Sequence, residues 1–386
     1  MHRDRALVFF LGAAHALDHS FLSVLPPVLL LVVNDLGSSL EEIGYVATFA
    51  YLLFGAGALV GGPLSDKIGE GKVVFASLAL SGISTLILLV DRGLTGFSAA
   101  LVLMSAWSSF YHPTANSLIS KRYGGEVGRV MAINGVCGSL GQVLVPSVAV
   151  FLALAAGWRS PFMFFGLLAM ATSIYFLRVP KLVEQEVRAT SSGPRIPRDS
   201  RFWLLFAYNI MIGLYFRGTE LFFPAYLTRV RGLSIELSGL SVTFLMAFGV
   251  LGQLLGGIGT DRFGGALALL VESIAVSLGF ASLQLEGFAG VAAFLVLFGV
   301  AFYATQPTTN VLTAEIAHPD QRGFMYGIMF FLVFGLGSIS SAIAGYIAER
   351  YGLQLVFSAM LVLSLLAFVA SSLLFRGWVT KNDSKA

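Results

Sequence analysis

The sequence is poor in charged residues. Asp, Glu, Lys and Arg make up only 12% of its 386 residues, whereas about 25% is usual for a soluble domain. Hydrophobic residues make up 56%, and a water-soluble fold of this length has too little interior to bury so much apolar side chain. A lipid bilayer removes that limit, so the composition predicts an integral membrane protein.

Other scarcities narrow the chemistry. Cys137 is the single cysteine, which excludes an internal disulfide and a cluster of metal-bound thiolates. The phosphate-binding pattern G-x-x-x-x-G-K-[ST] is absent, and no polar segment is long enough to form a nucleotide-binding domain. No pairing of a nucleophile with a base is evident, so we expect neither an enzyme nor a bound cofactor.

Apolar runs follow one another along the chain. A spanning helix needs about 20 mostly apolar residues, and this criterion predicts an all-α membrane protein with twelve transmembrane helices. The predicted spans are 6–33, 43–65, 73–90, 95–120, 128–155, 160–178, 202–228, 237–260, 266–284, 288–316, 322–348 and 354–376. The longest polar stretch, 179–201, falls between the sixth and seventh spans and contains three prolines. It predicts a cytoplasmic linker between two six-helix bundles, residues 1–178 and 202–386.

Basic residues are unevenly distributed among the predicted loops. With a cytoplasmic N-terminus, 18 of the 24 Lys and Arg residues fall on the cytoplasmic side and five on the other. Cytoplasmic loops of membrane proteins carry such an excess, so we expect both termini in the cytoplasm and the chain in the plasma (inner) membrane. The formal charge of +3 is then a sorting signal, and we expect no nucleic-acid partner.

The two predicted halves repeat each other. Residues 62–69 and 257–264 both read G-x-x-x-D-[KR]-x-G, at an offset of 195. Further matches are Pro113 with Pro307, Asn116 with Asn310 and Met131 with Met325 at an offset of 194, and Gly157 with Gly352 at 195. The near-constant offset predicts two parallel repeats related by an axis along the membrane normal.

The duplicated motif, the twelve spans and the basic linker resemble the major facilitator superfamily. That resemblance implies solute transport by alternating access, driven by a gradient. It leaves the substrate open, because one fold serves many solutes. Within the first half, residues 14–19 (AHALDH) and 108–113 (SSFYHP) are similar to the fosmidomycin-resistance efflux proteins, which implies proton-driven export of an organic compound.

Three ionisable side chains share one face of the first predicted span. His15, Asp18 and His19 stand at i, i+3 and i+4. Asp18 lies about 12 residues, roughly 18 Å, from the cytoplasmic start of the span and therefore near the midplane. Ionisable groups are costly at this depth. We interpret the three residues as a proton-coupling site. A structural hydrogen-bond cluster and a divalent-metal site of the same residues are the alternatives.

Further polar residues lie in predicted spans four, seven and ten, which line the central cavity in the superfamily that this chain resembles. The candidate substrate-binding residues are His112, Asn116, Gln306, Asn310, Arg217 and Glu220. His112 and Gln306 have matching depths, and each precedes a proline that would loosen the backbone. Arg217 and Glu220 fit a local ion pair, an outer gate or an anion contact. We interpret Gln142, Gln253 and Glu272 as contacts between helices.

The resemblance to the superfamily implies a cytoplasmic gate at the duplicated turns and two arginines. The acids of the turns would contact neighbouring helix starts in the outward-open state, and plain helix capping is the alternative. The predicted gate residues are Gly62, Asp66, Lys67, Gly69, Arg129, Gly257, Asp261, Arg262, Gly264 and Arg322.

These interpretations describe a monomeric secondary transporter in the bilayer that exports a small organic or amphiphilic compound in exchange for protons. The sequence leaves three alternatives open: a divalent-metal transporter, a protein for organic-anion uptake, and a transport-inactive membrane sensor of the same fold.

Overall fold

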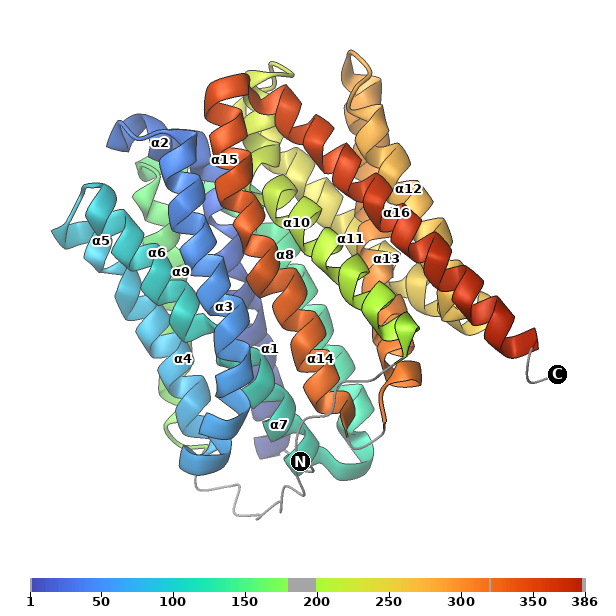
Figure 1. The fold of residues 1–386 in the computed structure, drawn as a ribbon. Coiled ribbons are helices and arrows are strands. Elements are labelled where there is room, and N and C mark those ends of the chain that lie inside the picture. The colour runs from blue at the N-terminus through green and yellow to red at the C-terminus, as the bar shows by residue number, and fades with distance from the viewer. Residues whose placement is uncertain (1, 180–198, 319–320, 384–386) are drawn as a thin grey trace.

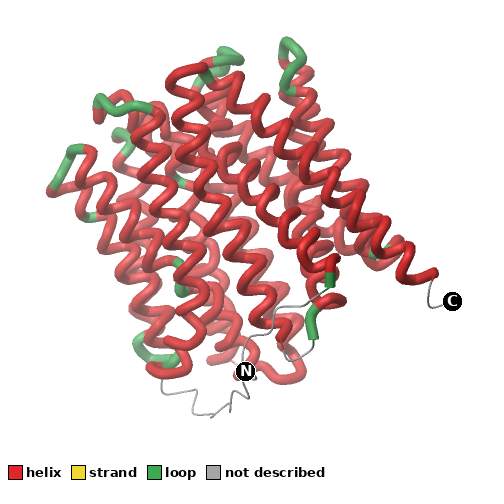
Figure 2. The backbone as a smooth tube through the Cα atoms, viewed as in Figure 1, coloured by secondary structure: helices red, strands yellow, loops and turns green. Residues whose placement is uncertain are grey.

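The computed structural model describes residues 2–179, 199–318 and 321–383, and within these ranges the chain forms helices and no strand (Figure 2). Most of the predicted linker 179–201 lies outside the described residues. The helices before it are α1 (His2–Ser23), α2 (Leu25–Leu36), α3 (Leu40–Ile68), α4 (Glu70–Thr85), α5 (Ile87–Val90), α6 (Leu94–Ser108), α7 (Tyr111–Tyr123), α8 (Val127–Ala156) and α9 (Arg159–Phe176).

The helices after it are α10 (Ser200–Arg229), α11 (Ile235–Phe263), α12 (Gly265–Ser282), α13 (Phe288–Ile316), α14 (Arg322–Phe330), α15 (Ile339–Tyr351) and α16 (Leu353–Asp383). A π-helical turn, Phe331–Gly335, and a 3₁₀ turn, Leu336–Ser338, connect α14 to α15. Below, the first half means the described residues up to 179 and the second half those from 199.

Nine helical segments among the described residues are long and apolar enough to cross a bilayer. One of them, Leu94–Ala156, runs through α6, α7 and α8 and therefore covers two predicted spans. Helices α9 and α10 coincide with the sixth and seventh predicted spans but are not among the nine. The count of twelve remains a prediction.

Four predicted spans are interrupted. The third, 73–90, divides into α4 and α5 at Leu86. The first divides into α1 and α2, because Pro26 and Pro27 at the start of α2 cannot donate backbone hydrogen bonds. The fourth divides into α6 and α7 at residues 109–110, shortly before Pro113, while the eleventh contains the π-helical turn. Pro307 behaves differently from Pro113, since α13 continues through it without a break. The expected loosening is visible as an interruption only in the first half.

The duplicated motif folds into the same turn twice. Gly69 (φ 92°) ends α3 and Gly264 (φ 83°) ends α11, and both backbone N–H groups donate to a carbonyl four residues earlier. A positive φ of this size favours glycine, which has no Cβ to clash. Gly157 (φ 85°) and Gly352 (φ 90°) form a second matched pair at the ends of α8 and α15. The sequence repeat is therefore also a repeat of local structure.

Helices pack mainly within their own half: α1 contacts α8, α4 contacts α9, and α13 contacts α11 and α12. Across the two halves, α3 lies beside α15 and α8 beside α11 (Figure 1). The N-terminal end of α1 and the C-terminal end of α16 both point towards the lower side of Figure 1, which is called the termini side below. The faces between the halves enclose the site.

A polar cavity between the two halves

A cavity of about 630 Å³ lies between the two halves. Its volume falls within the range of roughly 300–1,000 Å³ that is usual for small-molecule sites. All six predicted substrate residues line it, together with two residues of the predicted coupling site: His15, His19, His112, Asn116, Arg217, Glu220, Gln306 and Asn310. Asp18 is buried behind this wall.

Sequence reasoning missed part of the lining. Gln142 and Gln253, interpreted above as contacts between helices, both face the cavity, and the Nε2 of Gln253 donates to Oε1 of Gln306 over 3.1 Å. This bond joins α11 to α13, so the predicted helix contact of Gln253 is confirmed. The position of both glutamines at the cavity was not predicted, because the rotation of each helix about its own axis decides which side chains face inward. Other lining residues that were not predicted are Phe54, Ser139, Asn209, Phe216, Phe302, Tyr303, Thr309, Phe330 and Phe334. Their mixture of aromatic and amide groups suits an amphiphilic molecule.

The exposure of the lining residues shows where the cavity opens. Asn116 and Asn310, nearest the termini side, are exposed, and the His112 side chain is 24% exposed. Arg217, nearer the other side, is completely buried. Solvent therefore enters from the termini side.

The opposite end is closed by α3 and α15. Gly44 and Gly345 approach so closely that a Cβ on Gly44 would lie 2.5 Å from the carbonyl oxygen of Ser341 and 3.2 Å from the Cα of Gly345. Around them, the backbone N–H of Leu40 donates to Glu349 over 2.9 Å. Backbone packing, rather than a large side chain, closes this end.

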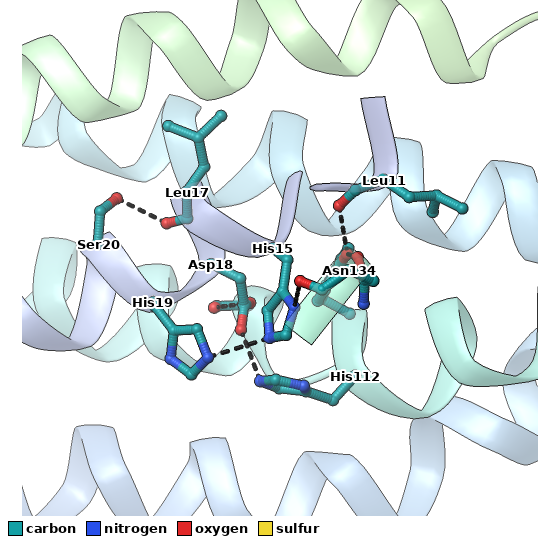
Figure 3. A network of polar contacts seen from close by, with 10 residues as sticks. Leu11, His15, Leu17, Asp18, His19, Ser20, His112 and Asn134 are labelled. Atoms are coloured by element: carbon teal, nitrogen blue, oxygen red, sulfur yellow. Dashed lines mark hydrogen bonds and ion pairs between the residues drawn. The ribbon is translucent and has the colours of Figure 1, made fainter. Parts of the chain in front are cut away.

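Asp18 is held by two partners from the interrupted fourth predicted span. Its Oδ2 lies 3.1 Å from Nε2 of His112, and its Oδ1 accepts a hydrogen bond from the hydroxyl of Ser108 (Figure 3). A buried carboxylate is costly without such partners. Because His112 also lines the cavity, one imidazole connects the buried carboxylate to the cavity.

The three imidazoles lie close together (Figure 3). Their hydrogen bonds indicate which ring nitrogens carry a hydrogen. The carbonyl oxygen of Asn134 can only accept, so Nδ1 of His15, 2.8 Å away, carries a hydrogen. The Nε2 of neutral His15 is therefore an acceptor, and Nε2 of His19 donates to it over 3.0 Å. Within this network His15 is fixed in one tautomer by the backbone of α8.

Neighbouring side chains leave the cluster little room. A Cβ added to Gly138 would lie 2.6 Å from ring atoms of His15. The hydroxyl of Tyr111 donates to the carbonyl of Leu11 over 2.7 Å and so ties α7 to α1. The cluster is thus held by α1, α6, α7 and α8.

The residues that could hold a metal differ from the predicted set. Nitrogen atoms of His15, His19 and His112 all lie within 4.8 Å of one another. The sequence interpretation named Asp18 in place of His112. Asp18 instead contacts His112 from the protein side, as an outer carboxylate does when it orients a ligating imidazole. Three imidazoles facing a cavity are suitable ligands for a divalent transition metal.

Arg217 and Glu220 form the ion pair that their spacing predicts. Nη1 of Arg217 donates to Oε2 of Glu220, and both side chains are almost completely buried. The guanidinium also lies over the ring of Tyr51 from the first half, 4.7 Å from its centroid. The pair is therefore at the contact between the halves. Glu272, by contrast, makes the predicted interhelix bond, accepting from Thr308 over 2.8 Å.

The predicted gate residues lie at helix ends on the termini side. Asp66 is 58% exposed and pairs with Lys121 of its own half over 3.0 Å. The side chains of Arg129, Asp261 and Arg322 are exposed. Lys67 and Arg262 lie at the ends of α3 and α11, and Gly62 and Gly257 have open space beside them. Such exposure is compatible with a gate that is open on this side.

The profile of the Major Facilitator Superfamily matches residues 8–342. The Hexuronate transporter of Bacillus subtilis (strain 168) is 24% identical over 379 residues, covering 89% of this chain and 87% of the relative. The Fosmidomycin resistance protein of Escherichia coli (strain K12) is 23% identical over 379 residues, covering 93% of this chain and 90% of that protein.

Solved structures agree on the fold. A bacterial homologue of the human lysosomal transporter Spinster, in an inward-facing and occupied conformation, superposes with a TM-score of 0.80 at 16% sequence identity, covering 98% of both chains. The profile match extends over most of the sequence, and the superposition over nearly all of it. The chain is therefore an integral membrane transporter that belongs to the Major Facilitator Superfamily.

Proposed function

We propose that this protein couples proton movement to the export of a small organic compound by alternating access. The observation that carries the proposal is the contact between buried Asp18 and His112, which lines the cavity. A carboxylate at this depth gains from being protonated whenever its cationic or donor partner withdraws. Exchange requires that proton and substrate bind alternately: substrate bound at His112 would hold its contact with ionised Asp18, whereas protonation of Asp18 would release His112 and with it the substrate.

The route of the proton follows from exposure. Asp18 is 1% exposed, whereas the His112 side chain is 24% exposed on its cavity side. A proton from the open side reaches His112 first and Asp18 second. Asn116 lies four residues further along α7, so movement of α7 would change the substrate frame and the proton site together.

The distribution of basic residues supports a cytoplasmic termini side in the plasma (inner) membrane. The cavity would then be inward-open, and its exposed gate residues would meet when it closes. Asp66 and Asp261 would contact the helix starts that carry Arg129 and Arg322. The similarity to a protein named for fosmidomycin resistance supports export as the direction.

Transport by the purified chain in liposomes tests the coupling. Accumulation driven by a pH gradient should be lost in Asp18→Asn, while exchange of labelled substrate without a gradient persists. Asparagine keeps the size of the side chain and the acceptor for Ser108 but cannot titrate. Asp35→Asn, an exposed acid outside the network, is the control. Unchanged gradient-driven accumulation in Asp18→Asn would remove Asp18 from the coupling mechanism, and absence of any flux would favour a sensor.

A second candidate is transport of a divalent metal, favoured by the three clustered imidazoles. Zinc ions added to purified protein would then raise its Tm, and His19→Ala would abolish that rise. The outer His318→Ala is the control. Stabilisation by organic compounds with no response to zinc supports the first proposal.

A further inference from the structure

The ion pair of Arg217 and Glu220 leaves part of the arginine unused. Glu220 accepts from Nη1 only. Nε and Nη2 of Arg217 are buried and have no hydrogen-bond partner among the described residues. These two donors point in parallel from one edge of the guanidinium, the geometry that binds two oxygens of a carboxylate or sulfonate. The free edge is therefore a complete bidentate donor.

Leaving such donors unpaired is costly. A buried polar group without a partner loses its hydration without replacement, and the loss is larger for a charged group. Arg217 is 0% exposed and lines the cavity, so the unpaired donors stand at a place that a ligand can approach. A structural ion pair would not require an arginine with a vacant edge.

Aromatic rings surround the guanidinium. Tyr51 of α3 and Phe334 of the π-helical turn lie 4.7 and 4.8 Å from its carbon atom, measured to the ring centroids. Cation–π contacts hold the guanidinium plane but leave its edge available. Phe334 belongs to a π-helical turn, an irregular segment that often occurs at functional sites.

We propose that Arg217 binds the anionic group of the transported compound through its Nε–Nη2 edge, which makes the substrate an organic acid. This proposal rests on the proposed function and names its substrate class. Glu220 balances the charge of the empty site. The remainder of the ligand would occupy the space between the aromatic side chains and the amides of Gln253, Gln306 and Asn310. Because Tyr51 and Arg217 come from different halves, a bound anion would also change the strength of the contact between the halves.

Equilibrium binding to the purified protein tests the proposal without any pH gradient. The probes are two acids and their neutral amides: D-glucuronate with D-glucuronamide, and 4-phenylbutyrate with 4-phenylbutyramide. Thermal shift and calorimetry at millimolar concentrations should show binding of at least one acid and not of its amide. The two acids distinguish a sugar acid from an arylalkanoate as the preferred source of the carboxylate.

Three variants locate the binding. Arg217→Gln combined with Glu220→Gln removes both charges together, and affinity for the acid should fall about 10- to 100-fold. Arg217→Lys keeps the charge but loses the parallel donors, and about a tenfold loss is expected. Arg229→Gln, at the exposed end of the same helix, should bind as the native protein does.

Three outcomes would overturn the proposal: equal binding of acid and amide, undiminished binding by the double variant, or no binding of either acid. Failure of the coupling proposal gives a different result. Asp18→Asn would then leave gradient-driven transport intact, whereas the equilibrium affinity for the acid reports only on Arg217.

Discussion

The two halves share a scaffold and differ in the chemistry that they present to the cavity. His112 of the first half matches Gln306 of the second, and Asp18 matches Gly213 at an offset of 195. Conversely, Arg217 matches Leu22. Three imidazoles and a buried carboxylate are thus gathered in the first half, and the guanidinium that lines the cavity belongs to the second. The two halves therefore supply equivalent walls with different side chains, and our proposals assign the proton site to one wall and the anion contact to the other.

Exchange of the matched residues His112 and Gln306 should remove this difference between the halves, and it has the largest expected effect on transport. His112→Gln gives the first half the residue of the second and removes the contact with Asp18. Coupling between proton and substrate should weaken by about 5- to 150-fold, measured as the loss of gradient-driven accumulation relative to exchange. Adding Gln306→His should not restore it, because the second half has Gly213 where Asp18 would be needed. Restoration would show that the halves are interchangeable.

Tight packing around the proton site gives a second test, within one helix. Gly138→Ala places a Cβ 2.6 Å from His15, so about 1–3 kcal/mol of destabilisation is expected. Gly135→Ala, where no atom lies within 4 Å of the added carbon, should change stability by less than about 1 kcal/mol and favourably. Thermal unfolding in detergent measures both. Equal Tm values would mean that the side chains around His15 can shift at little cost in stability.

The duplicated turns, which carry the predicted gate residues, also differ between the halves. Asp66 has Lys121 as a partner, whereas the residue that matches Lys121 is Glu315. Interactions of an acid with a helix start contribute about 0.3–1 kcal/mol. Asp66→Ala and Asp261→Ala should therefore each raise labelling of a cysteine at position 116 by about two- to fivefold, in a Cys137→Ser background. Unchanged labelling in both variants would favour plain capping.

The smallest expected effect concerns the side opposite the termini. Hydrogen bonds from Trp158 and then from Arg159 lower the pKa of Asp35 below its ordinary value of 3.8. The folded state therefore gains stability above pH 4, and loses it as the pH falls through the lowered pKa. Asp35 is 49% exposed, so Asp35→Asn should cost less than about 1 kcal/mol at pH 7.

The difference between native and Asp35→Asn should shrink as the pH falls below 3.8 and vanish once it is below the lowered pKa, when unfolding is followed as a function of pH. The second half has Val230, Leu353 and Gln354 at the matching positions. Val230→Asp should therefore not create the same pH dependence, because it gains neither partner. A pH-independent difference for Asp35→Asn would contradict the ion pair.

Much of the fold was predictable because local patterns in the sequence determine it. Apolar runs, the duplicated turn and positively charged loops each depend on neighbouring residues, and Gly69 and Gly264 adopt the expected equivalent turns. The helical register of His15, Asp18 and His19 also predicted their proximity.

The assembly of the site was less predictable, because it depends on how helices rotate and pack. Nothing in the pattern around Ser108 or Asn134 identified them as partners of the coupling residues. Gln253 makes the predicted helix contact, with Gln306, but its position at the cavity was not predicted. An isolated glutamine carries no periodic signal that shows whether its side chain faces a cavity.

The π-helical turn Phe331–Gly335 coincides with a change in the offset between the two repeats. The repeat offset is 194 at Met131 and Met325 but 195 at Gly157 and Gly352. Between these positions the second half has one more residue than the first, where α8 is regular. A π-helical turn accommodates one additional residue without ending the helix. The turn thus accommodates the residue by which the second half is longer here, and it places the ring of Phe334 against Arg217, where the first half has no counterpart of either feature.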